Sequence, residues 1–158
     1  MRLHVPIGLR WSDLDAYGHV NNASMLRLLE EARIQAFWVA DHAEEAVGGT
    51  TAVLDGRPGA DTLTLIARQE VEYLAPIPYQ RQPLDVQLWL ARLGGASMEV
   101  DYEVHAPQGA EPDVLYTLAS TTIVLVDATT GRPRRMSDRE RSAWEPYVDE
   151  PVRFRRHA

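Results

Sequence analysis

The sequence of 158 residues contains no cysteine and no lysine, since all 16 of its Lys and Arg residues are arginine. The absence of cysteine excludes disulfides, thiolate metal sites and a cysteine nucleophile. The absence of lysine excludes Schiff-base chemistry and a lysine-dependent phosphate loop. Any nucleophile in this protein therefore has to be an oxygen or an imidazole nitrogen.

The chain also lacks long apolar runs and an excess of positive charge. Its longest fully apolar stretches, 36–40 and 123–126, are far below the roughly 18 residues that a membrane span needs. No signal-peptide pattern follows Met1, so we predict a cytoplasmic protein. The formal net charge of −7 argues against general affinity for nucleic acid. Length and composition are ordinary for one globular domain, which we predict over residues 1–158.

Alternating apolar and polar residues predict five strands, at about residues 3–11, 62–74, 84–93, 98–105 and 114–126. In the first strand, apolar residues from Leu3 to Trp11 share one face, and Pro6 with Gly8 favours a position at the edge of the sheet. In the second strand, the residues expected to face inward are Leu63, Leu65, Ala67, Val71 and Tyr73. Short turns join the last four strands, which predicts an antiparallel meander.

One segment has the period of an α-helix. From Ala23 to about Ala40, apolar residues recur at spacings of four and three, and Asn21 and Asn22 can cap the first turn. The ion pairs expected on the exposed face are Arg27 with Glu31 and Glu30 with Arg33. Because this is the one long helix in the pattern, we predict an α+β fold in which it packs against one face of the sheet.

The segment between the first strand and the helix carries the residues best placed for chemistry. The first amide N–H groups of a helix have no acceptor within it and carry partial positive charge, so they can polarise a carbonyl oxygen. A carboxylate a few residues upstream, from Asp13 or Asp15, can face the same carbon. Gly18 can adopt a positive φ and bring the backbone close to a substrate.

Two other interpretations of this segment compete with catalysis. Asp13 and Asp15 belong to a residue type that commonly serves in turns and caps. The spacing of the two aspartates and Gly18 also resembles the opening of a calcium-binding EF-hand loop. Calcium binding is excluded because Tyr17 and Ser24 occupy positions where that loop needs oxygen ligands and a glutamate. The five histidines have no partners at metal-ligand spacing, so we predict no metal site.

The motif Asp-x-Asp-x-x-Gly-His-Val-Asn-Asn over residues 13–22 is followed by Met-Leu-Arg-Leu-Leu-Glu-Glu-Ala-Arg over 25–33. Together with segments at 71–76 and 126–133, these runs resemble hotdog-fold acyl-CoA thioesterases of the 4-hydroxybenzoyl-CoA thioesterase type. The resemblance implies a five-stranded antiparallel sheet wrapped around one long helix, and hydrolysis of an acyl-CoA thioester. It also implies a homodimer or homotetramer with active sites at the subunit interface. Coenzyme A is then part of the substrate, and no separate cofactor is implied.

The same resemblance assigns roles to residues of the motif. It implies that Asp15 attacks the thioester carbonyl or activates a water molecule. It further implies that the backbone N–H of Asn22 polarises the thioester oxygen and that Gly18 shapes the approach. Losing one such donor typically costs about 2.7–4 kcal/mol of transition-state stabilisation. His19 is a candidate for proton transfer, with a loop-stabilising hydrogen bond as the alternative. Nearby candidates for substrate contact are Tyr17 and Asn21.

The phosphates of coenzyme A need cationic partners. The related enzymes carry an Arg-Arg-Lys type run after the third strand, whereas the corresponding turn here runs from Arg92 to Ser97 with a single arginine. Residues 132–158 hold eight arginines against five acids, while residues 1–131 carry a net charge of −10. We therefore name Arg92 and Ser97, together with Arg132, Arg134 or Arg135, as candidates for binding the nucleotide end, with ordinary surface residues as the alternative.

Three further possibilities stay open at this point. Glu30 and Glu31 occupy helix positions where another branch of hotdog enzymes places its carboxylate, so Glu31 is the second candidate for catalysis. A non-catalytic protein that binds acyl-CoA or acyl-carrier protein is the main alternative, and the presence of Asp15 favours the enzyme. A dehydratase of the same fold normally needs a histidine and an acid that face each other from different segments.

Overall fold

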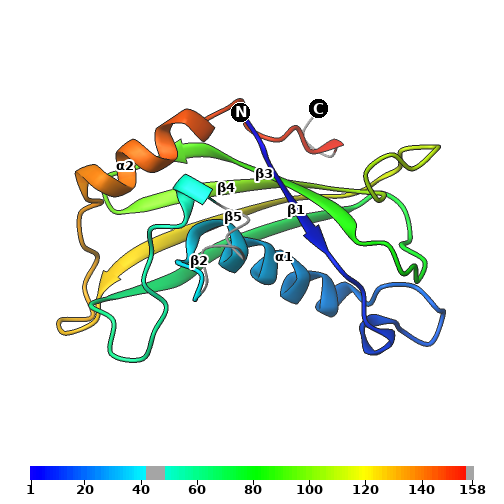
Figure 1. Cartoon of the computed structure of the whole chain (residues 1–158), viewed down its shortest axis with the longest axis horizontal. Helices are drawn as coiled ribbons and strands as arrows, with labels where there is room; N and C mark the ends of the chain where they lie inside the picture. Colours follow the sequence, from blue (N-terminus) through cyan, green and yellow to red (C-terminus); the bar gives the residue numbers. More distant parts are fainter. Residues whose placement is uncertain (42–48, 156–158) are drawn as a thin grey trace.

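The computed structural model describes residues 1–41 and 49–155, and it shows a five-stranded antiparallel sheet with a helix against one face (Figure 1). We call the face covered by this helix the inner face and the opposite one the outer face. The strands are β1 (Leu3–Ile7), β2 (Thr62–Tyr73), β3 (Leu84–Leu93), β4 (Ser97–His105) and β5 (Leu115–Asp127). The helices are α1 (Asn22–Phe37) and α2 (Asp138–Trp144), and the short 3-10 turns are η1 (Trp11–Asp13), η3 (Gly49–Thr51) and η4 (Glu145–Tyr147).

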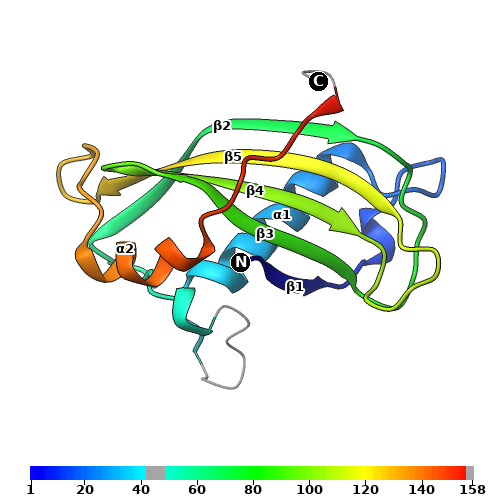
Figure 2. The same cartoon turned by 90° about the horizontal axis from the view of Figure 1, so that it is seen from above.

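The strand order in the sheet is β1-β3-β4-β5-β2, with every neighbouring pair antiparallel. The edge position predicted for the first strand is confirmed. The predicted meander of four strands is wrong, because β2 pairs with β5 at the far edge instead of with β3. The connection over residues 74–83 carries the chain across the end of the sheet from the edge strand β2 to β3, which lies beside the opposite edge strand β1 (Figure 2). Consecutive strands are sheet neighbours where short connections join β3 to β4 and β4 to β5.

Helix α1 crosses the inner face diagonally (Figure 2). It begins after Asn21, whose side-chain oxygen accepts a hydrogen bond from the Ala23 amide at 2.8 Å. It ends at Phe37, earlier than predicted, because Trp38 is extended and Val39 donates its N–H to the Leu54 carbonyl at 2.8 Å. The side chains that α1 buries against the sheet include Met25, Leu28, Leu29, Ala32, Ala36 and Phe37.

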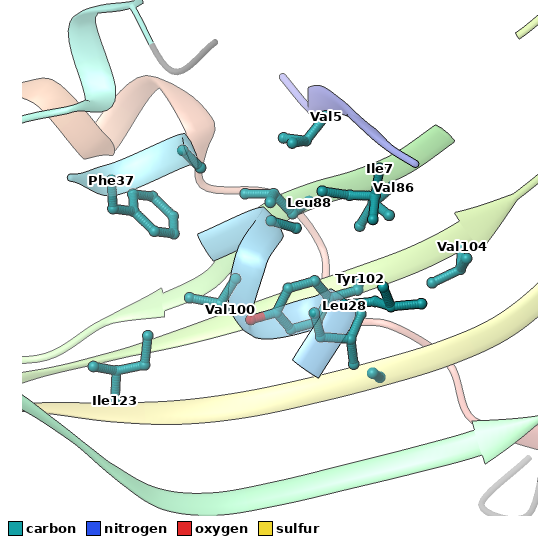
Figure 3. Packing of buried hydrophobic residues seen from close by; sticks show 14 of the residues in the cluster. Val5, Ile7, Leu28, Phe37, Val86, Leu88, Val100, Tyr102, Val104 and Ile123 are labelled. Carbon is teal, nitrogen blue, oxygen red and sulfur yellow. The ribbon is translucent and has the colours of Figure 1, made fainter. Parts of the chain in front are cut away.

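The hydrophobic core lies between α1 and the inner face of the sheet. Figure 3 shows Tyr102 of β4 beneath the helix, close to Leu28. The alternating side chains of β4, Met98, Val100, Tyr102 and Val104, are all at most 1% exposed, as the sequence pattern predicts. Burying each large apolar side chain contributes about 1.5–3 kcal/mol, so this layer fixes the position of the helix on the sheet.

Two strands differ from the predicted alternation. β2 has a bulge between Ile66 and Arg68, and the side chains of Leu63 and Leu65 before it are about half exposed instead of buried. An extra residue in one strand reverses the faces on one side of the bulge, which the period of two cannot anticipate. β1 is also shorter than predicted, and Trp11 lies in η1 with 75% of its surface exposed.

Neither of the two predicted surface ion pairs forms within the described residues. Glu31 accepts a hydrogen bond from Gln35 and does not pair with Arg27. Arg33, expected to pair with Glu30, is 3% exposed and donates to the Tyr102 hydroxyl at 3.2 Å. The helical stripe that faces the sheet is thus wide enough to include this arginine.

The last part of the chain adds a helix that the sequence analysis did not predict. Ser137 and Glu140 form a capping box at the start of α2, and Trp144 packs edge-on against Phe37 with ring centroids 5.9 Å apart. Beyond it, the chain crosses the outer face, where Val152 donates its N–H to Asp101 at 2.7 Å. Part of the predicted connector, residues 42–48, lies outside the described residues. No described helix is long and apolar enough to cross a membrane.

Candidate active site

A closed loop over residues 10–21 leads from β1 to α1. The side chain of Asp13 is buried, and it accepts hydrogen bonds from the backbone N–H of Arg10 at 2.7 Å and from its guanidinium at 3.1 Å. The N–H of Asn21 donates to the Asp13 carbonyl at 2.8 Å, which joins the two ends of the loop. Asp13 therefore holds the loop together, in agreement with the capping alternative for this residue.

Asp15 is oriented by the backbone of the same loop. Its Oδ1 atom accepts hydrogen bonds from the N–H of Tyr17 at 2.8 Å and of His19 at 3.2 Å. Gly18 closes the turn with a φ of 78°, a conformation that side chains disfavour. The second carboxylate oxygen, Oδ2, has no hydrogen-bond partner within the described ranges. One oxygen of Asp15 is thus fixed by the loop and the other is free to act on a ligand.

The start of α1 presents an amide N–H beside this loop. Asn22 is the first helical residue, so its N–H has no acceptor within the helix, and no other acceptor for it exists in the described part of the chain. The Ala23 N–H, by contrast, is already bound to the Asn21 side chain. The Asn22 N–H is therefore available to an incoming carbonyl oxygen.

Tyr73 connects the end of β2 to the helix start. Its hydroxyl donates to the Asn22 carbonyl at 2.8 Å, and burial raises the pKa of the phenol, which keeps it a donor. The alternating pattern of β2 predicted Tyr73 on the inner face but gave no indication of a role in the site. A tyrosine at the end of a strand carries no local signal for this role, because its partner is 51 positions away in the sequence.

A pocket of about 660 Å³ joins these elements. Its walls come from the loop, the start of α1 and the segment after β2. The N–H of Val20 in the loop donates to the Ile77 carbonyl in that segment at 2.9 Å, which joins the two walls. The predicted site residues that line it are Asp15, Tyr17, His19, Asn21 and Asn22, and the further lining residues include Met25 and Tyr73 to Ile77. The structure therefore brings most of the predicted site together in one cavity.

None of the candidates for phosphate binding lines this pocket. Arg134 donates to Thr62 at the start of β2, whereas Tyr73 ends that strand. Since β2 has 12 residues, its two ends are roughly 36 Å apart. Arg92 is largely exposed, 3.7 Å from Glu99, and lies with Ser97 near the same distant end of the sheet.

Arg134 is occupied by an ion pair that the sequence analysis did not predict. Its guanidinium donates to both carboxylate oxygens of Glu140, at 2.9 and 2.5 Å. Burial alone would raise the pKa of Glu140, but the hydrogen bonds from Arg134 and Ser137 hold it below its ordinary value. Through Arg134, this pair attaches α2 to the start of β2.

The alternative catalytic carboxylates, Glu30 and Glu31, lie outside this pocket. Glu31 accepts from Gln35 at 3.1 Å and lines, with Glu30 and Arg27, a separate groove between α1 and β1. Among the described residues, no three His, Asp or Glu side chains come together as metal ligands.

A five-stranded antiparallel sheet around a helix whose first turn opens into a pocket is the hotdog architecture of thioesterases. The sequence profile of the thioesterase-like superfamily matches residues 9–145, and the chain belongs to this family. No curated protein matches the chain by sequence.

Solved structures similar to this chain carry the same fold. A predicted thioesterase from Bacillus stearothermophilus is 23% identical, with a TM-score of 0.73 over 96% of this chain and 100% of that one. A candidate acyl-CoA thioesterase from Xanthomonas campestris is 27% identical, with a TM-score of 0.63 over 86% of this chain and 100% of that one. A DHNA-CoA thioesterase from Staphylococcus aureus is 18% identical, with a TM-score of 0.65 over 92% and 87%.

Proposed function

We propose that the protein hydrolyses acyl-CoA thioesters in the pocket between residues 15–22 and 73–77. The observation that carries this proposal is that Asp15, with one carboxylate oxygen unbound, and Asn22, with an N–H that has no acceptor in the described part of the chain, line one cavity. A carbonyl group placed between them would have a base or nucleophile at its carbon and a hydrogen-bond donor at its oxygen. These are the two groups that acyl transfer needs.

Two reaction routes use the same atoms. In the first, Asp15 takes a proton from water, the water oxygen bonds to the carbonyl carbon, and the carbon–sulfur bond then breaks. In the second, Oδ2 of Asp15 itself attacks and forms a mixed anhydride, which water hydrolyses. Either route consumes one water molecule and yields a free acid and the thiol of coenzyme A. The Asn22 N–H stabilises the negative charge that develops on the carbonyl oxygen.

Neighbouring residues support this arrangement. Tyr73 holds the Asn22 carbonyl, which lies in the peptide after the one that carries the Asn22 N–H, and so restrains Asn22 from its other side as a positioning residue. His19 also lines the pocket, where its imidazole would be available to deliver a proton to the leaving sulfur. The ring of Tyr17 stands at the pocket with most of its surface exposed, where it can contact the pantetheine arm.

The open edge of β2 supports assembly into a homodimer. This long edge strand exposes apolar side chains, among them Leu65 and Ile66, whereas the other edge, β1, is short and contains Pro6. An edge of the first kind readily pairs with another chain. Two β2 strands paired about a twofold axis run antiparallel, so the start of one lies near the end of the other. The partner subunit's Arg134 and its arginine-rich neighbourhood would then approach the pocket formed by Tyr73.

A non-catalytic acyl-CoA sensor is the second candidate. It is favoured by one observation, namely that Asp15 already has a structural role in its own loop. Release of free thiol from acyl-CoA esters of differing chain length, measured together with equilibrium binding, separates the two functions. Turnover of at least one ester supports the enzyme. Binding without turnover supports the sensor.

A further inference from the structure

Two aromatic rings are exposed next to the proposed pocket. Trp11 of η1 has 75% of its surface exposed and Tyr79 has 38%, and the two rings pack edge to face with their centroids 5.2 Å apart. Aromatic rings are ordinarily buried, because each carries a large apolar surface. Large apolar groups that stay exposed together commonly mark a binding site. The indole of Trp11 therefore keeps a flat face available to a ligand.

The backbone places this aromatic pair beside the pocket. Trp11 comes two residues before Asp13, whose carbonyl accepts the N–H of Asn21 at 2.8 Å. Two residues span at most about 7 Å and a hydrogen-bonded pair of residues about 5.5 Å, so the backbone of Trp11 lies within roughly 13 Å of Asn21 in the pocket wall. Tyr79 comes two residues after Ile77, which also lines the pocket. The loop and the segment after β2, which carry the two rings, lie at the same end of the sheet (Figure 2).

Each of these two segments also carries an exposed arginine. Arg81 follows Tyr79 by two residues, is exposed, and forms no ion pair with another residue in the described ranges. Arg10 directly precedes Trp11, and its guanidinium donates to Asp13 while its side chain stays 69% exposed. Guanidinium groups bind phosphates through paired hydrogen bonds. The aromatic pair thus has cationic groups beside it, unlike the pocket itself.

We propose that Trp11 and Tyr79 hold the adenine ring of coenzyme A and that Arg81 contacts its phosphates. This inference rests on the proposed function and assigns the nucleotide end of its substrate to a site in the same subunit. About thirteen bonds separate the sulfur of coenzyme A from its first phosphorus, and an extended chain of that length spans roughly 15 Å. A thioester in the pocket can therefore bring its nucleotide to the aromatic pair. Adenine suits this place because every base offers a flat π surface for stacking.

The test pairs substrates with and without the nucleotide. These are an acyl-CoA ester that the protein hydrolyses and the pantetheine ester of the same acid. Trp11→Leu, Tyr79→Leu and Arg81→Gln should each raise KM for the CoA ester at least about fivefold with little change in kcat, because the lost contact is equally strong in the ground state and the transition state. The pantetheine ester should be hydrolysed by these variants as it is by the wild type. Val39→Ala shortens an exposed apolar side chain beyond the other end of α1, and this matched control should affect neither ester.

Tryptophan fluorescence gives a second readout, which does not depend on turnover. Trp11 is far more exposed than Trp89 and Trp144, which are at most 1% exposed. Coenzyme A should quench the fluorescence of the wild-type protein, whereas pantetheine should not. Trp11→Phe should lose this quenching but keep a KM closer to the wild-type value than Trp11→Leu does, because a phenyl ring can still stack on adenine.

The outcomes separate this inference from the proposed function. Equal kcat/KM values of the wild type for the CoA and pantetheine esters overturn the inference and leave the thioesterase function standing. A KM that rises equally for both esters in Trp11→Leu also overturns it, because the change then acts on the pocket through the loop. An unchanged KM for the CoA ester in Arg81→Gln overturns the assignment of the phosphates.

Two further results are also decisive. If no thioester is hydrolysed, the proposed function fails, and quenching by coenzyme A alone decides whether the nucleotide site exists. If Trp11→Leu does not fold, Tyr79→Leu and Trp11→Phe decide.

Discussion

Replacing Asp15 by asparagine separates the chemistry of this residue from its role in the loop. Asparagine keeps an oxygen that can accept the two backbone hydrogen bonds now made by Oδ1, from Tyr17 and His19. We therefore expect the free energy of unfolding to change by less than about 1 kcal/mol, because only the charge-assisted part of those bonds is lost. The amide cannot act as a base or nucleophile, and we expect kcat to fall by about 10²–10⁴.

Asp13→Asn is the matched control two positions earlier. Asp13 is buried and binds Arg10, but it does not line the pocket. We expect this change to lower the free energy of unfolding by about 1 kcal/mol and Tm by about 2–4 °C. The expected loss is small because the Arg10 guanidinium is exposed, so solvent weakens its interaction with Asp13. The kcat of the folded fraction should stay close to the wild-type value.

The assay follows thiol release from the best acyl-CoA ester, and thermal unfolding is measured on the same preparations. Wild-type kcat in Asp15→Asn would refute the assignment of this carboxylate. Unfolding of Asp15→Asn at a much lower temperature than Asp13→Asn would refute the claim that the loop depends mainly on Asp13.

Three further outcomes follow from the structure. Tyr73→Phe removes one hydrogen bond to the Asn22 carbonyl, worth about 0.5–1.5 kcal/mol, so kcat should fall up to about tenfold with little change in KM in steady-state assays. The hydrogen bond to Glu103 raises the pKa of His105, so its stabilisation is complete below the ordinary histidine pKa and disappears as pH rises through the raised value. The stability lost in His105→Gln, measured by urea unfolding, should accordingly be larger at pH 5.5 than at pH 9, and equal losses would contradict this. Leu65→Glu should place a charge on the open edge of β2 and shift the mass measured by light scattering toward the monomer; an unchanged dimer would exclude that edge as the interface.

Local patterns predicted the parts of the fold that depend on local interactions. The alternation in β4 and the cap at Asn21 each involve residues that are close in the sequence, and both were predicted correctly. The pairing of β2 with β5 was not predicted, because it is a contact between segments far apart in the sequence and has no local signal. The capping box of Ser137 and Glu140 was a readable signal for α2 that the sequence analysis did not use.

In the candidate site, too, the features set by neighbouring residues were predicted and those set by tertiary contacts were not. The residues of the loop were predicted because the loop and the helix start are contiguous, and Asp15 and Asn22 do line one pocket. Tyr73 was missed because it reaches the site through the fold of the sheet. The burial of Arg33 was missed because a charged residue at the margin of the apolar stripe is ordinarily assigned to the surface.

The bulge in β2 has a consequence for both ends of that strand. Without the extra residue, the half before the bulge would turn over, and the hydroxyl of Thr62 would leave the guanidinium of Arg134 while Tyr73 kept its place at the helix. Deleting Ala67 should therefore detach the end of the sheet that carries α2 and leave the end beside the pocket assembled. One extra residue in β2 thus allows Thr62 to reach Arg134 at one end of the strand while Tyr73 reaches the start of α1 at the other.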